Sequence, residues 1–185
     1  MQTLTVASVA TVTALAAGLA TAETMTIDLA GVNSNDNFGV AGNHQELAAL
    51  GNVHVTGIGW DNVVGNGDDT GVTWGNEMRM AVVDSASLSG VFVTFFPSEG
   101  SATAGGVWGP ASSDGIIDLI SNGIDFYTDS GSLLVEMYES YDDASGATDA
   151  HYESGTVTIE YAVPAPGALA LLGLAGIAGT RRRRR

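Results

Sequence analysis

The residues of this chain best suited to bind a ligand are asparagine and aspartate side chains gathered in turn-rich segments. Three clusters occur: Asn33, Asn35, Asp36 and Asn37; Asn66, Asp68 and Asp69; and Asp142, Asp143 and Asp149. Ca²⁺ takes roughly six to eight oxygen ligands from carboxylates, amide side chains and carbonyls. We therefore hypothesise a calcium site, for which the candidate ligands are Asn35, Asp36, Asp142, Asp143 and Asp149. No cluster matches the helix–loop–helix calcium motif, and the competing interpretation is that these residues simply form turns.

Histidine offers a second kind of metal ligand. The pairs His44 with Glu46 and His151 with Glu153 are each two residues apart, which places both members on one face of a strand. A zinc or manganese site could use such pairs. Scattered histidines, with His54 as the third, are more often polar surface residues, and we favour that interpretation.

Catalytic signatures are sparse. The chain contains no cysteine and no lysine, which excludes thiol and lysine nucleophiles, and it has no Gly-x-Ser-x-Gly elbow. Its glycine-rich stretches lack the lysine of a phosphate-binding loop. Paired carboxylates for glycoside hydrolysis can be drawn from 21 acidic residues, but geometry decides that mechanism. We therefore predict that the protein is not an enzyme, and keep a secreted hydrolase as the third hypothesis.

Tryptophan could stack on a sugar ring. The three tryptophans are Trp60, Trp74 and Trp108, and packing in the protein interior is the favoured role for all three. Trp108 lies in the sequence Gly-Gly-Val-Trp-Gly-Pro and is predicted to be the most exposed. It is therefore the candidate for stacking on a ligand.

The elements that must position these side chains are predicted to be strands. Short β-branched and aromatic runs alternate with Gly, Asn, Asp and Ser turns, which is typical of an all-β protein. The predicted strands cover residues 24–29, 52–60, 77–83, 90–96, 116–120, 133–138 and 156–163. In the last of them Val157, Ile159 and Tyr161 should point to the core. Only residues 45–50 could form a helical turn or two.

Two antiparallel sheets packed face to face fit this pattern. The strand, acidic loop and strand from Ser132 to Tyr161 resemble the closing strands of jelly-roll P-domains and galactose-binding-like sandwiches. This resemblance implies a jelly-roll-like antiparallel β-sandwich. A single domain, residues 23–162, should contain it.

The charge of that domain is strongly negative. All 21 acidic residues lie between 23 and 162, whereas Arg79 is the only one of six basic residues there, so its formal charge is about −20. Such a charge opposes binding to nucleic acid or to anionic lipid. It suits cation binding or a saline setting, or serves solubility alone.

Residues 1–22 read as a secretory signal peptide. They are small and apolar and end in Ala20-Thr21-Ala22, a small-x-small cleavage site before Glu23. No lysine or arginine precedes the apolar run. The general secretion machinery is the partner that this segment predicts.

Residues 163–185 combine Val163, Pro164, Ala165 and Pro166 with an apolar run from Gly167 to Gly179 and with Arg181, Arg182, Arg183, Arg184 and Arg185. The run predicts a short transmembrane helix, and the arginines should stay cytoplasmic. This order of proline motif, apolar helix and arginine cluster resembles the PEP-CTERM sorting signal of exported bacterial proteins, with Ala165 between the prolines in place of the usual glutamate. The resemblance implies cleavage by an exosortase-type membrane protease. A permanent anchor that is never cut is the alternative.

Together these features predict a bacterial protein that is exported, transiently anchored in the inner membrane, and released to the cell surface or extracellular matrix. The resemblance implies an association with exopolysaccharide and biofilm material, so extracellular polysaccharide is an expected partner. The first hypothesis is a structural or adhesive surface component. The second is a carbohydrate-binding module, calcium-dependent if one of the acidic loops binds that ion.

Overall fold

A computed structural model describes residues 21–67, 71–98, 104–142 and 147–163. Several predicted features lie outside the described residues: the signal peptide through Ala20, the segment from Pro164 to Arg185, and the side chains of Asp68, Asp69 and Asp143. Among the described residues there is no helix whose length and apolar character would let it span a bilayer.

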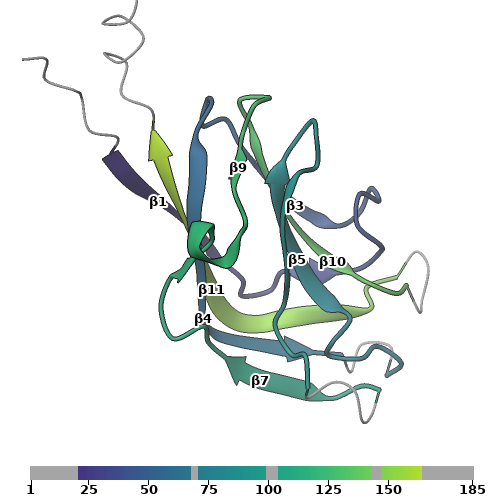
Figure 1. Cartoon of the computed structure of the whole chain (residues 1–185). Helices are drawn as coiled ribbons and strands as arrows, with labels where there is room; N and C mark the ends of the chain where they lie inside the picture. The colour runs from purple at the N-terminus through teal and green to yellow at the C-terminus, as the bar shows by residue number, and fades with distance from the viewer. Residues whose placement is uncertain (1–20, 68–70, 99–103, 143–146, 164–185) are drawn as a thin grey trace, which may run out of the picture. The chain divides into compact units, whose positions relative to one another are not determined.

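Apart from one short 3-10 helix, the regular elements of the described chain are all strands (Figure 1). The elements are β1 (Thr21–Asp28), β2 (Asn33–Ser34), β3 (His44–Ala48), β4 (His54–Asn66), β5 (Met78–Asp84), β6 (Gly90–Thr94), β7 (Val107–Ala111), β8 (Ile117–Asp118), the 3-10 helix η1 (Ile120–Asn122), β9 (Phe126–Tyr127), β10 (Leu133–Glu139) and β11 (Ala150–Val163). All strand pairs between these elements are antiparallel. The prediction of an all-β, antiparallel fold is therefore confirmed.

The strands form two sheets. The larger sheet has the order β1-β11-β4-β7, with β2 paired to β11 and with β8 and β9 paired to β4. The smaller sheet has the order β3-β10-β5-β6. Their inner faces share one apolar core, so the arrangement is sandwich-like.

The core follows the alternation expected of strands with one buried face. Val157, Ile159 and Tyr161 are all buried, as predicted. The large sheet contributes Val55, Ile58, Val157 and Ile159, and the small sheet contributes Met80, Val82, Val93, Val135 and Met137.

The expected helical turn at residues 45–50 is wrong, because this segment supplies β3. Leu47 pairs with Leu134 of β10, and the register runs from Ala48 to His44. Six residues are too few to nucleate a stable helix, whereas the edge of β10 offers backbone partners to an extended segment.

Two strands are longer than predicted. β4 continues past Trp60 to Asn66, and β11 begins at Ala150 rather than at residue 156. Both extensions contain glycine or polar residues, and the pairing between them has register shifts near Ser154. Such bulges let a strand continue through positions that read as turns in the sequence.

The outer face of the small sheet is partly covered by the loop between β2 and β3. The ring of Phe38 lies 5.4 Å from Phe92 and 5.5 Å from Tyr138, measured between centroids. Beneath this loop the buried carboxylate of Glu136 accepts hydrogen bonds from the Gly39 amide (2.7 Å), Asn43 Nδ2 (2.7 Å) and Gln45 Nε2 (2.9 Å). Glu136 therefore fixes the loop against the sheet.

The first and last strands are neighbours. β1 pairs with β11 along its whole length, from Thr21 opposite Val163 to Asp28 opposite Thr156. The two ends of the described domain therefore leave from the same end of one strand pair.

Candidate functional site

The fold brings described residues of the three Asn/Asp clusters toward one end of the sandwich. Ser34 of β2 pairs with Ala150 of β11, and Asn33 pairs with His151. His151 also pairs with Asn66 at the end of β4. The strands β2, β4 and β11 are far apart in the sequence but are neighbours here. The composition of the separate clusters did not predict this.

Residues of the first cluster are held by local hydrogen bonds. The Asp36 carbonyl accepts from the Glu139 amide (3.0 Å), which connects this loop to the end of β10. Asn35 Nδ2 donates to the Gly42 carbonyl (2.6 Å), and the Asp36 amide donates to Asn43 Oδ1 (2.9 Å). Asn35 and Asp36 therefore lie in a rigid turn beside β10.

Residues of the third cluster approach the same place. Asp149 is fully buried, its amide donates to the Ser34 carbonyl (3.2 Å), and its own carbonyl accepts from Thr73 Oγ1 (3.1 Å). Asp142 is partly buried and follows Glu139 by one short turn. The structure describes four of the candidate ligands. Three of them, Asn35, Asp36 and Asp149, lie in segments that backbone hydrogen bonds connect to one another or to β10.

Three further polar residues at this end were not predicted. Glu139, Ser34 and Tyr152 are each fully buried. Glu139 is the last residue of β10 and continues the inward face of Leu133, Val135 and Met137. Inward residues recur at every second position of β10, so the sequence pattern alone could have predicted that Glu139 points inward.

Tyr152 faces Glu139 from the opposite sheet. Burial, reinforced by the negative charge of Glu139 and then by Tyr138, raises the pKa of the Tyr152 phenol well above its usual value. The ring packs edge-on against Phe95, with 5.7 Å between centroids. The interior of this end is therefore rich in oxygen atoms, in contrast to the apolar core beside it.

The two predicted histidine–carboxylate pairs lie on different sheets. His44 Nε2 lies 3.4 Å from Glu46 Oε1 on β3, whereas His151 lies on β11 of the other sheet. Within the ranges that the structure covers, no three His, Asp or Glu side chains are arranged to share a metal ion. These ranges give no support to a zinc or manganese site of that kind.

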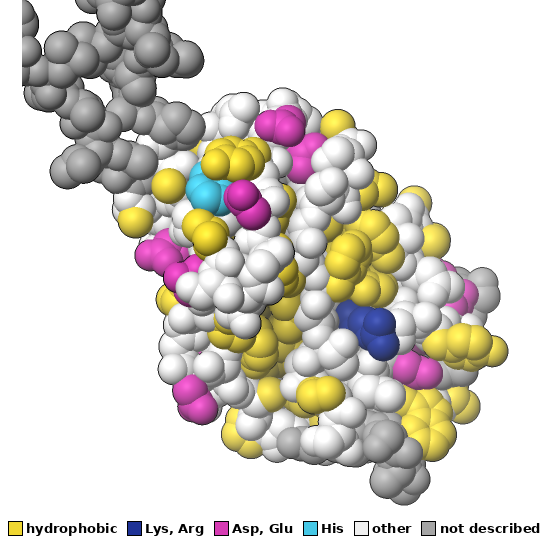
Figure 2. Space-filling model, viewed as in Figure 1, with side chains coloured by type: hydrophobic (Ala, Val, Ile, Leu, Met, Phe, Trp, Pro, Cys, Tyr) yellow, Lys and Arg dark blue, Asp and Glu magenta, His cyan; other side chains and the backbone are white. Residues whose placement is uncertain are grey.

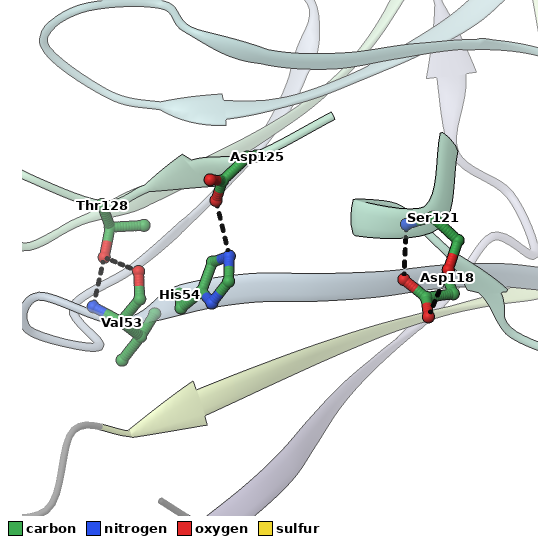
Figure 3. A network of polar contacts seen from close by, with 6 residues as sticks. All are labelled: Val53, His54, Asp118, Ser121, Asp125 and Thr128. Atoms are coloured by element: carbon green, nitrogen blue, oxygen red, sulfur yellow. Dashed lines mark hydrogen bonds and ion pairs between the residues drawn. The ribbon is translucent and has the colours of Figure 1, made fainter. Parts of the chain in front are cut away.

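His54 forms a separate pair that the sequence did not indicate (Figure 3). Its Nε2 lies 2.8 Å from Asp125 Oδ1, and its ring stacks on Tyr127 at 4.3 Å between centroids. In the same segment Thr128 Oγ1 accepts from the Val53 amide (3.0 Å), and Asp118 accepts from the Ser121 amide and hydroxyl. These contacts attach the 118–128 segment to β4, which is a structural role.

The prediction that Trp108 is exposed is wrong, because its side chain is only 5% exposed. The indole lies against Gly67 at one end and Gly75 at the other, and a Cβ added at either glycine would collide with the ring. Its centroid is 6.4 Å from that of Phe96. Trp108 is a core residue in this structure, and its burial does not suit ligand stacking.

Two open clefts lie elsewhere on the surface. A cleft of about 330 Å³ has a mixed lining, in which Trp60 and Ile116 are apolar and Asp61, Ser112, Asp114, Thr156 and Thr158 are polar. An apolar groove of about 300 Å³ lies between β6 and the 117–124 segment and includes Phe92, which is half exposed. On the face of the molecule seen in Figure 2, hydrophobic side chains lie next to the only Lys or Arg side chain in view.

Comparisons with protein family models, with curated proteins and with solved structures gave no match for this chain.

Proposed function

We propose that this chain is an exported bacterial protein whose acidic β-sandwich acts at the cell surface or in the extracellular matrix as a structural or adhesive component. The observation that carries the proposal is the pairing of β1 with β11. Because Thr21 lies opposite Val163, a leader before β1 and a tail after β11 would both attach at one end of the domain.

The proposed processing sites are compatible with this pairing. Cleavage after Ala22 removes only the first two residues of β1 and leaves Glu23 to Asp28 paired with β11. Cleavage near Pro164 and Pro166 falls after the last residue of β11, Val163. Neither cut removes a residue of the core between the sheets.

We further propose that the sandwich is a jelly roll. Eight strands of the described chain have five or more residues: β1, β3, β4, β5, β6, β7, β10 and β11. Renumbered in chain order, they give sheets with the orders 1-8-3-6 and 2-7-4-5. This order supports the assignment, because a jelly roll is a double sheet of eight strands folded as two Greek keys. The fold supports no particular activity by itself.

Replacing Arg181–Arg185 with glutamine tests the proposed sorting. In a bacterium with an exosortase-type protease, the wild-type chain should reach the cell surface or medium without its arginines. The variant should be processed poorly, because the basic flank that holds the tail on the cytoplasmic side is gone. Immunoblots of cytosolic, membrane and extracellular fractions measure this.

Arg79→Gln is the matched control, since it removes the only basic residue of the domain and leaves the tail intact. It should be sorted like the wild type. Equal sorting of the tail variant and the wild type would contradict the proposal.

A carbohydrate-binding module is the second candidate. The cleft of about 330 Å³ supports it, because the hydroxyls of Thr156 and Thr158 and the carboxylate of Asp114 can hydrogen-bond to sugar hydroxyls. A glycan array with and without calcium tests this candidate. Binding that Thr158→Val weakens would support the cleft, and an array without any bound glycan would favour the purely structural role.

A further inference from the structure

We propose that the free edge of β6 pairs with the β6 strand of a second copy of this chain, so that two small sheets join into one continuous sheet. The pairing would be antiparallel around a two-fold axis at Phe92. This proposal goes beyond the proposed function and does not depend on where the protein is sorted.

The first argument is the composition of the sheet edges. β1 and β7 are the outer strands in the order of the large sheet, and β3 and β6 are those of the small sheet. Three of these strands carry a residue that discourages pairing with another chain: Glu23 in β1, Glu46 in β3 and Pro110 in β7. β6 reads Gly-Val-Phe-Val-Thr, without charge or proline, and its pairing with β5 has no bulge. Of these four edges, β6 is therefore the most open to another strand.

The second argument is the direction of the backbone groups of β6. The Asp84 amide donates to the Ser89 carbonyl at 2.9 Å just before the strand begins. Bonded and non-bonded pairs alternate along an antiparallel ladder, so Gly90, Phe92 and Thr94 turn their amides and carbonyls away from β5. Within the described part of the chain, no hydrogen bond reaches β6 from a strand other than β5. These backbone groups are therefore available to a further strand.

The third argument is the register that self-pairing allows. A two-fold axis at Phe92 places this residue opposite its own copy and places Gly90 opposite Thr94 of the second copy. All outward-facing residues of β6 then exchange backbone hydrogen bonds across the seam between the copies. No other antiparallel register of two β6 strands pairs all of them.

The fourth argument is the apolar groove of about 300 Å³ that lies between β6 and the 117–124 segment. Val91 and Val93 face the core, so the same residues of the second copy would point to the same side of the joined sheet. There they can cover Trp60 and Ile117, which line the groove. On the opposite face the two Phe92 rings, each half exposed, would form an aromatic cross-strand pair. The added strand therefore covers apolar surface on both faces.

Charge predicts how this association should respond to salt. The chain has a formal charge of −15, but β6 itself has none. Two copies therefore repel each other through the surface around the seam, and salt should weaken that repulsion. Binding of a basic partner to the acidic surface would respond to salt in the opposite direction.

Sedimentation velocity of the full-length protein in mild detergent tests the proposal. A dimer should be populated at about 0.1 mM protein, because one short strand pair lies at the small and weak end of specific interfaces. Raising the salt concentration from about 0.05 M to about 0.5 M should increase the dimer fraction. A wild-type chain that stays monomeric at this concentration in high salt would overturn the proposal.

Phe92→Glu should abolish the dimer, because it places two like charges directly opposite each other. Leu47→Glu is the matched control, since Leu47 is 65% exposed in β3 at the other edge of the same sheet. It should leave the dimer fraction unchanged, and circular dichroism checks that both variants fold. A dimer that persists in Phe92→Glu, or that is lost in Leu47→Glu, would overturn the proposal by placing the interface elsewhere.

An engineered cysteine locates the seam, since the chain has no cysteine of its own. Bonded antiparallel pairs have Cα atoms about 5.5 Å apart, which a disulfide can span. Mild oxidation should therefore trap Phe92→Cys as a covalent dimer on a non-reducing gel, whereas Leu47→Cys should stay largely monomeric. Equal cross-linking of the two variants would overturn the proposal. This experiment keeps the test decisive if Phe92→Glu does not fold.

Discussion

Trp108→Ala is expected to lower the free energy of unfolding by about 3–5 kcal/mol, the usual cost of truncating a buried aromatic side chain. The indole is 5% exposed and fills the space between Gly67, Gly75 and Phe96. The two glycines bring backbone against the ring and cannot move in to fill the cavity as a flexible side chain could. Urea unfolding followed by circular dichroism measures the loss.

Val107→Ala is the control for this prediction. Val107 precedes Trp108 in β7 but is 55% exposed, so its truncation should change stability by less than about 1 kcal/mol. A Trp108→Ala protein as stable as the wild type, but with weakened glycan binding, would contradict the core role. It would restore the interpretation of Trp108 as a stacking residue.

Asp84→Ala is expected to cost about 3 kcal/mol, because it removes a buried, charged acceptor that several hydrogen bonds share. The Asp84 carboxylate is 1% exposed and accepts from the amide and hydroxyl of Ser87 at 2.9 and 2.8 Å. It also accepts from the amide of Ser130 at 3.0 Å and from the Ser130 hydroxyl. These bonds connect the turn after β5 to the segment before β10.

The same carboxylate makes stability depend on pH. The hydrogen bond from the Ser130 side chain, with those from Ser87 and the Ser130 amide, holds the pKa of Asp84 well below its usual range despite burial. A lowered pKa gives a contribution that is fully present above the ordinary aspartate pKa of about 3.9 and is lost as pH falls through the folded-state pKa. The stability difference between wild type and Asp84→Ala should therefore shrink below about pH 4.

Asp118→Ala is the control, since Asp118 also accepts from a serine amide and hydroxyl, those of Ser121, but is exposed. Its replacement should have a much smaller effect. Equal losses from the two variants at neutral pH would show that burial of Asp84 adds nothing.

Strand content could be predicted from the sequence wherever alternation was regular. In β11 the apolar side chains at Val157 and Ile159 recur every second residue, so both the strand and its buried face followed directly. The segment 45–50 could not be assigned this way, because its extended conformation depends on pairing with β10, which is a tertiary contact. The 3.6-residue and two-residue periods are hard to tell apart over six residues.

The candidate site was predictable only in part. The sequence indicated Asn35, Asp36 and Asp149 by type and local density. It could not indicate that β2 would place two clusters side by side, because that requires the register of β11. The burial of Trp108 could not be predicted for a related reason. The glycines beside it in the sequence indicate an exposed turn, but Gly67 and Gly75, which are distant in the sequence, leave the space that the indole occupies.

Intact-mass and terminal peptide analysis of the protein isolated from its native cells tests the central claim most directly, namely that both ends of the chain direct handling by a membrane and that the acidic β domain functions outside the cell. The account predicts an extracellular or surface species that begins at Glu23 and ends near Pro164–Pro166. A species that begins at Glu23 but keeps all five arginines would replace cleavage with a permanent anchor. An intact chain of 185 residues in the cytosol would contradict the account.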